Sequence, residues 1–194
     1  AKGFNIQTYF SMDGRELNNI KTTLIKAGDE EVLRLRYITA ASLIYINDRW
    51  RSQKEEGFPV NKISGHWKAA MPKTDEANSN PEDYTRVKLM TTTTADAIYI
   101  EPIEALGLDR DGVITLQYAL KRAIVNKYQV EQNEMGTVII GDEDYPNILI
   151  YESAEGSLGI LSQLINDVYA FNAIVEEAIT ICRYDDKNYK APAS

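Results

Sequence analysis

Cysteine and histidine are almost absent from the 194-residue chain, which has one of each, Cys182 and His66. A single cysteine excludes an internal disulfide and is typical of a reducing compartment, so we expect a cytoplasmic protein. Zinc is usually held by about four Cys, His or carboxylate ligands. We therefore expect no metal and no cofactor. His66 has no acidic residue at the spacing of a catalytic motif, which argues against nucleophilic catalysis.

Long apolar runs are also missing. No stretch approaches the roughly 20 residues of a membrane-spanning helix, and no basic-then-apolar leader opens the chain, so we expect no membrane partner. The chain starts without Met and ends at Pro192-Ala193-Ser194, from which we expect a segment of a longer protein. It has neither a Walker-type Lys-Ser/Thr loop nor an Asp-Glu-x-His box, so we expect a segment that is not itself an enzyme.

Charge is unevenly distributed along the chain. Residues 1–73 hold 12 Lys and Arg against 8 Asp and Glu, a balance of +4, whereas residues 74–194 hold 9 against 21, a balance of −12. An acidic surface repels a phosphate backbone. Any contact with nucleic acid is therefore expected within the first 73 residues.

Alternating apolar and polar side chains predict strands in the first part of the chain. We expect strands at 4–10, at 32–38, at 43–46 with a turn at Asn47-Asp48, and near 60–63. In the strand at 32–38, three side chains face one side of the sheet and two arginines face the other. These are Leu33, Leu35 and Tyr37 against Arg34 and Arg36.

The second part alternates strands with helices. Residues 74–84 are polar and contain proline, which predicts a linker between a β-rich subdomain at 1–73 and an α/β domain at 85–194. The resulting β-α-β-β-α-α order predicts an α+β, or mixed α/β, fold. The predicted elements are a strand over 87–100 bent near Asp96, a helix at 115–128, strands at 137–140 and 148–151, and two helices using residues 158–165 and 171–182.

A strand-to-helix junction at 148–159 carries the most informative pattern. An apolar run ends at Tyr151-Glu152, a turn with Gly156 and Gly159 follows, and an apolar helix begins directly after it. Backbone at such a junction can approach a partner closely. The turn lacks the Lys of a phosphate-binding loop, and Glu152 and Glu155 would repel phosphate, so we expect no nucleotide there.

Two other sets of residues suggest chemistry. Asp96, with Glu101, Glu104 and Glu152, offers the carboxylates with which a nuclease holds Mg²⁺, although surface acids explain the same residues. A basic and aromatic set suits phosphate contact and base stacking, although a solvated sheet face explains it equally well. The nucleic-acid-binding candidates are Arg34, Arg36, Arg49, Trp50, Arg51 and Lys54.

Residues 84–182 resemble a known family. A Thr-rich strand runs from Val87 to Asp96, a helix contains Tyr118–Ala123, Glu134-Met135-Gly136 follows, and Ile150-Tyr151-Glu152 precedes two glycines. Together these motifs are similar to the MrfA-type zinc-binding domain, a helicase-associated domain of unknown function at the C-terminal end of many DEAD/DEAH superfamily 2 helicases and phage-defence proteins. The residues that carry the likeness are Asp96, Tyr151, Glu152, Gly156 and Gly159.

The likeness implies an accessory domain and not a motor. Family members carry a four-cysteine cluster after the last helix, where this chain keeps only Cys182, so zinc binding is not carried over. Ser157 also replaces the usual second glycine of the turn. We expect a module that helps a helicase or defence complex to hold DNA or that docks the motor domain. The alternatives are a metal-dependent nuclease, or its remnant, using Asp96 and Glu152, and a scaffold that binds proteins.

Overall fold

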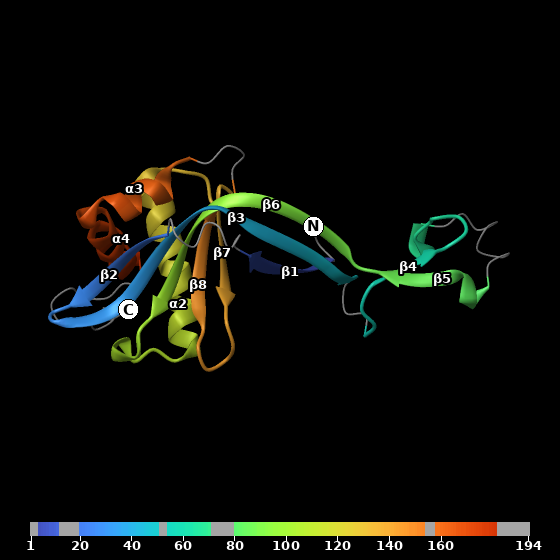
Figure 1. The fold of residues 1–194 in the computed structure, drawn as a ribbon, viewed down its shortest axis with the longest axis horizontal. Helices are drawn as coiled ribbons and strands as arrows, with labels where there is room; N and C mark the ends of the chain where they lie inside the picture. Colours follow the sequence, from blue (N-terminus) through green and yellow to red (C-terminus); the bar gives the residue numbers. More distant parts are fainter. Residues whose placement is uncertain (1–3, 12–19, 51–53, 71–79, 154–157, 182–194) are drawn as a thin grey trace. The chain divides into compact units, whose positions relative to one another are not determined.

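The chain forms two compact units in the computed structural model, and each unit combines two stretches of sequence. The structure describes residues 4–11, 20–50, 54–70, 80–153 and 158–181. Unit 1 contains Ala1–Ser11 and Leu43–Thr93, and unit 2 contains Met12–Ser42 and Thr94–Ser194. Strands β3 (Glu30–Trp50) and β6 (Leu89–Pro102) each run from one unit into the other (Figure 1).

The predicted linker at 74–84 falls within unit 1. Residues 74–79 lie outside the described part of the chain, and the η3 helix (Pro81–Asp83) and the first residue of β5 (Tyr84–Val87) occupy most of the remainder. The division into 1–73 and 85–194 therefore stays a prediction.

Unit 2 is built on a sheet with the strand order β2-β3-β6-β8-β7. Strand β2 (Lys21–Ala27) pairs antiparallel with the first part of β3 through the two-residue loop Gly28-Asp29. Gly28 has φ +67°, which the tight turns of such hairpins require. Strands β7 (Met135–Ile140) and β8 (Asn147–Glu152) form a second antiparallel hairpin, and β8 pairs with β6.

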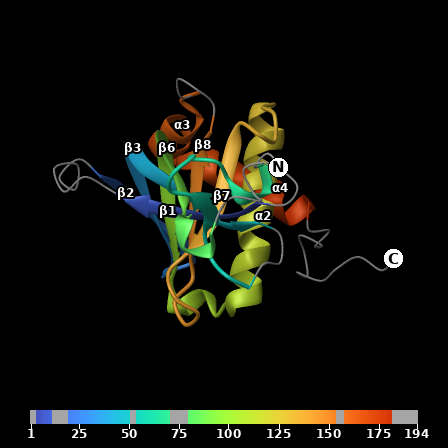
Figure 2. The same cartoon turned by 90° about the vertical axis from the view of Figure 1, so that its right-hand side faces the viewer.

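In the described part of the chain, three α-helices pack on this sheet. They are α2 (Arg110–Tyr128), α3 (Ile160–Asn166) and α4 (Val168–Ile181), and the short η4 helix (Glu104–Leu106) precedes them. The Asp109 side chain caps α2 by accepting a hydrogen bond from the Gly112 N–H at 2.8 Å. Figure 2 shows the helices beside the strands. Every second residue of the central strands enters the helix-facing core, which includes Ile98, Ile100, Ile148 and Ile150.

Unit 1 contains the remaining strands. They are β1 (Phe4–Ser11), the last part of β3, the first part of β6, and an antiparallel pair formed by β4 (Phe58–Asn61) and β5. The η2 helix (Lys68–Ala70) also belongs to this unit. Three aromatic rings meet here edge to face, with Trp67 5.8 Å from Trp50 and 5.6 Å from Phe58. Among the described residues, no helix is both long and apolar enough to cross a membrane.

The fold class and most elements agree with the sequence analysis. The order β6-α2-β7-β8-α3-α4 confirms the predicted β-α-β-β-α-α series, and Leu33, Leu35 and Tyr37 are all buried in the helix-facing core. The predicted turn at Asn47-Asp48 is wrong, because β3 continues to Trp50. Asp48 stays in the strand since its buried carboxylate accepts hydrogen bonds from Gln7 and Arg49.

Candidate functional site

The strand-to-helix junction of unit 2 is held by the side chain of Glu152. This glutamate is only 2% exposed, and its carboxylate accepts three backbone hydrogen bonds. One oxygen, Oε2, accepts from the Leu158 and Gly159 N–H groups at 2.5 and 3.1 Å, and Oε1 accepts from the Leu161 N–H at 2.8 Å. These N–H groups lie at the start of α3, where a helix has unsatisfied donors and a partial positive charge. Glu152 therefore caps the helix.

Gly159 shapes the backbone that brings these donors together. It is the N-cap residue of α3 and has φ +71°, a conformation that costs glycine little and strains other residues. The glycine and the glutamate of the predicted motif thus act on the same helix start. Gly156, the other glycine of the motif, lies outside the described residues.

Asp96 holds an irregular point of the neighbouring strand β3. Its Oδ2 accepts a hydrogen bond from the Tyr37 hydroxyl at 3.0 Å, and its Oδ1 accepts one from the Ala40 N–H at 3.1 Å. Ala40 has φ +51°, which is uncommon for a residue with a side chain. The carboxylate therefore stabilises a strained position within strand β3, 56 residues away in sequence.

Asp96 and Glu152 lie on adjacent strands. The ladder pairs Ala97 with Tyr151, and Asp96 and Glu152 are the next residues along the two strands. Burial raises the pKa of the nearby Tyr37 hydroxyl to about 12, and the hydrogen bond and charge of Asp96 add to the effect. The part of the chain that the structure describes has no group of three or more Cys, His, Asp or Glu residues placed to hold a metal ion. The observed contacts of both carboxylates fit a structural role.

Tyr151, the other motif residue on β8, packs across the sheet on a glycine. It pairs with Gly136 of β7, and a Cβ atom at that glycine would come within 2.1 Å of the tyrosine ring. The missing side chain of Gly136 therefore makes room for the ring. This explains why the Glu134-Met135-Gly136 motif and Tyr151-Glu152 occur together, because their residues share one register.

Arg34 and Arg36 lie on the sheet face opposite Leu33 and Leu35. Both guanidinium groups approach the same oxygen of Glu101, at 3.7 Å for Arg34 and 3.1 Å for Arg36. The Tyr99 hydroxyl is influenced by the same charges. Burial raises the pKa of Tyr99 first, and the charge of Glu101 raises it further. One acid thus offsets part of the positive charge that the sequence analysis assigned to nucleic acid.

The other predicted nucleic-acid contacts belong to unit 1. Arg49 lies within 3.3 Å of both Asp48 and Glu56, and Trp50 packs on Trp67. Lys54 is exposed, and Arg51 lies outside the described residues. Of the six candidates, Arg34 and Arg36 therefore belong to unit 2 and the other four to unit 1.

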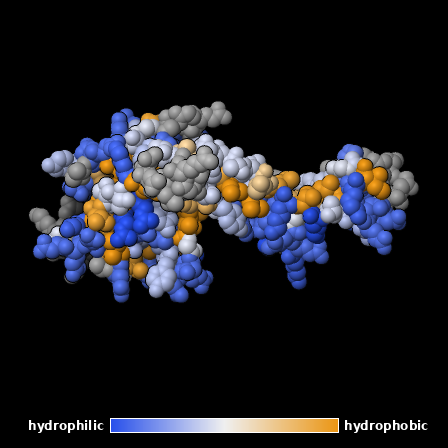
Figure 3. Space-filling model, viewed as in Figure 1, coloured by the Kyte–Doolittle hydropathy of each residue, from blue (hydrophilic) through white to orange (hydrophobic). Residues whose placement is uncertain are grey.

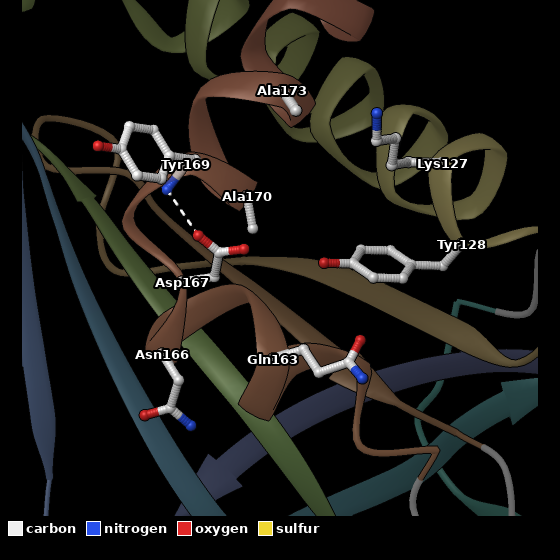
Figure 4. A pocket seen from close by; sticks show the side chains of 8 residues that line it. All are labelled: Lys127, Tyr128, Gln163, Asn166, Asp167, Tyr169, Ala170 and Ala173. Carbon is white, nitrogen blue, oxygen red and sulfur yellow. Dashed lines mark hydrogen bonds between the residues drawn. The ribbon is translucent and has the colours of Figure 1, made fainter.

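A hollow that the sequence analysis did not predict lies between the ends of α2 and α3 and the start of α4 (Figure 4). Its volume is about 590 Å³. Asp167 accepts the Tyr169 N–H at 2.9 Å, and the Tyr128 pKa is raised by burial first and then by the Asp167 charge. The lining mixes an ammonium, a carboxylate, two amides and two phenols, a set that identifies no single class of ligand. No motif marks it, since its residues come from three helices.

By its fold, the chain is similar to part of a helicase of known structure. No protein-family model matches the chain, and no curated protein matches it. Among solved structures, it is similar to the DUF1998 helicase MrfA bound to DNA, with a TM-score of 0.50 and 11% identity over 94% of this chain and 21% of the helicase. MrfA bound to DNA and AMPPNP gives a TM-score of 0.34 at 11% identity, over 96% and 20% of the two chains. The family likeness predicted from the sequence is confirmed at the level of fold.

Proposed function

We propose that this chain is a non-motor accessory domain of a larger helicase-like protein and that it helps this protein to hold DNA. The observation that carries the proposal is the shared fold over 94% of the chain with a helicase that was crystallised with DNA. The chain spans only 21% of that helicase. The motor activity is accordingly assigned to other parts of such a protein.

The charge of the two units supports unit 1 as the DNA-facing part. Unit 1 has nine Lys and Arg against seven Asp and Glu, a net charge of +2, whereas unit 2 has 12 against 22, a net charge of −10. A phosphate backbone is attracted to the first and repelled by the second. Unit 2 is better suited to dock a basic protein surface, such as one on the motor domain.

Three lysines of unit 1 are the strongest candidates for phosphate contact. Lys54, Lys62 and Lys68 are exposed, and none forms an ion pair with a described residue. The Lys68 ammonium lies 5.3 Å from the centre of the Tyr84 ring, and the Trp50–Trp67 pair lies in the same unit. Cations beside aromatic rings are typical of surfaces that bind single-stranded nucleic acid.

Fluorescence anisotropy with labelled single-stranded DNA tests the proposal. We expect binding at low salt, with an affinity that falls steeply as salt rises. The triple substitution Lys54→Glu, Lys62→Glu and Lys68→Glu should weaken binding and reduce the salt slope by about 0.7 for each phosphate that a lysine no longer neutralises. A flat anisotropy at low salt with both single-stranded and duplex DNA would exclude DNA holding.

A matched control introduces the same charge change in unit 2. The variant Lys121→Glu, Arg122→Glu and Lys127→Glu replaces three cations of α2 and should alter binding much less than the unit 1 variant. Arg34→Glu with Arg36→Glu should have an intermediate effect, because Glu101 already offsets these arginines. An equal loss of affinity in the two triple variants, which change the net charge by the same amount, would show that only net charge matters and would remove the assignment to unit 1.

A further inference from the structure

The hairpin tip at residues 61–66 of unit 1 presents an apolar side chain to solvent. Ile63 is 81% exposed, more than any other large apolar residue that the structure describes. Figure 3 shows hydrophobic surface among hydrophilic atoms over the part of the molecule that holds β4 and β5. Turns normally carry polar residues, Gly or Pro at their tips. An isoleucine at this position is therefore unusual.

The tip is held in one conformation by its own hydrogen bonds. The Asn61 side chain is buried, and its oxygen accepts the N–H groups of Ile63 and Ser64, each at 2.9 Å. The Asn61 backbone accepts from the Gly65 N–H at 2.8 Å and donates to the His66 carbonyl at 3.0 Å. Because the backbone conformation of the tip is already fixed, little conformational entropy of this segment is lost when Ile63 contacts a partner.

The base of the hairpin is also fastened. Val60 and Trp67 form an antiparallel bridge, and the Trp67 ring packs edge to face on the buried Phe58 ring at 5.6 Å. The Lys62 N–H donates to the Asp83 carbonyl at 2.7 Å. The hairpin that carries Ile63 is therefore held in place by hydrogen bonds and by aromatic packing.

The charges around the tip favour a nucleic acid as its partner. Residues 60–68 contain Lys62, Lys68 and His66 and no acidic residue. The nearest acid by backbone contact, Asp83, uses its carboxylate to accept the Asn80 N–H at 2.8 Å. Ile63 lies between Lys62 and Lys68 in the sequence, so this segment offers an apolar side chain to stacked bases and cations to phosphates.

We propose that Ile63 is a wedge that enters the base stack where single-stranded and double-stranded DNA meet, while Lys62 and Lys68 contact the flanking phosphates. Apolar side chains such as isoleucine separate neighbouring bases when a protein inserts them into a stack. This assignment rests on the proposed DNA-holding function and specifies the form of DNA that unit 1 recognises. A wedge would keep the separated strands apart while the motor acts elsewhere.

The test uses forked DNA with 2-aminopurine in the base pair at the junction. The fluorescence of this base rises when it loses its stacking, so the wild-type chain should increase the signal on binding. Ile63→Ser should lose this increase and keep its affinity for plain single-stranded DNA, since the lysines remain. Ile6→Ser is the matched control, because Ile6 is a half-exposed isoleucine of the same unit, and it should behave as wild type.

The outcomes separate the wedge from the broader function. Binding of forked DNA without a rise in fluorescence, or an equal rise with Ile63→Ser, would overturn the wedge and leave DNA holding intact. Failure of the wild-type chain to bind any DNA would overturn both. Tryptophan fluorescence probes unit 1, because Trp50 and Trp67 both lie there. An unchanged urea midpoint in this signal would show that Ile63→Ser still folds.

Discussion

Unit 2 uses its charged motif residues inside its own fold, whereas unit 1 leaves several of its cations in solvent. Glu152 and Asp96 accept hydrogen bonds from backbone and tyrosine groups of unit 2. Lys54 and Lys62 of unit 1 are exposed. The difference shows that the most recognisable sequence motif fastens the larger unit. The charged side chains that remain exposed to a partner include these lysines of the smaller unit.

Two optical signals distinguish the units. Both tryptophans of the chain lie in unit 1, and the described α-helices lie in unit 2. Tryptophan fluorescence therefore reports unfolding of unit 1, and circular dichroism at the helix band reports unit 2. Transitions that coincide in every variant would show that the two units unfold as one.

The largest effect is expected from Glu152→Ala. The substitution leaves three backbone N–H groups at the start of α3 without their acceptor, which should lower the free energy of unfolding by about 3 kcal/mol. Urea unfolding followed by circular dichroism measures this loss, and the tryptophan transition should move less. Glu176→Ala, on the exposed face of α4, is the control and should change stability by less than about 0.5 kcal/mol. A similar small loss for Glu152→Ala would refute the capping role.

Gly136→Ala should have the next largest effect. The new methyl group would overlap the Tyr151 ring, and forcing the buried ring aside should cost about 2 kcal/mol. Thermal or urea unfolding of unit 2 measures this cost. In the double variant with Tyr151→Leu, the alanine should cost much less, because the ring that it would strike is gone. Additive costs would show that the glycine is needed for another reason.

The sequence was sufficient to predict the fold class because its periodicities are local. The two-residue alternation placed Leu33, Leu35 and Tyr37 in the core, and helical periodicity located α2. The β2 strand was missed since its run of threonine and lysine has weak alternation, whereas its pairing with β3 and the packing of Ile25 against the core stabilise it. The Asn47-Asp48 turn was predicted wrongly because Gln7, which is distant in sequence, donates a hydrogen bond to the buried Asp48 within the strand.

The candidate site was predictable only in part. The sequence marked Asp96, Glu152 and Gly159 as members of a pattern, but their roles depend on where the fold places donors. Asp96 meets Tyr37 across 59 residues, and no local pattern links the two. Ile63 carried no predicted role, although the Asn61 to Gly65 turn was a usable signal. Its importance follows from exposure and hydrogen bonding, which a sequence does not reveal.

A smaller effect is expected from the pairing of Arg36 with Glu101. Both side chains are partly exposed, and such pairs contribute about 0–1 kcal/mol. A double-mutant cycle with Arg36→Met and Glu101→Gln should give a coupling energy in this range that decreases as salt is added. A coupling far above it, and insensitive to salt, would place this pair among the internal fasteners of unit 2.

The last effect concerns Tyr37 and is visible only at high pH. Burial and Asp96 raise the pKa of this phenol from 10.0 in the unfolded chain to about 12. Below pH 10 both states keep the proton, so the contribution to stability is complete. It is lost as pH rises from about 10 through 12, because the unfolded state releases its proton first.

Unfolding by urea across this range should therefore show a shallower loss of stability in Tyr37→Phe than in wild type. Some slope should remain, since the pKa of Tyr99 and of Tyr128 is also raised. Tyr118→Phe, on the exposed side of α2, should keep the wild-type slope. Equal slopes in all three proteins would mean that the Tyr37 hydroxyl is not held by Asp96 in solution, and unit 2 would lack one of the internal hydrogen bonds that distinguish it from unit 1.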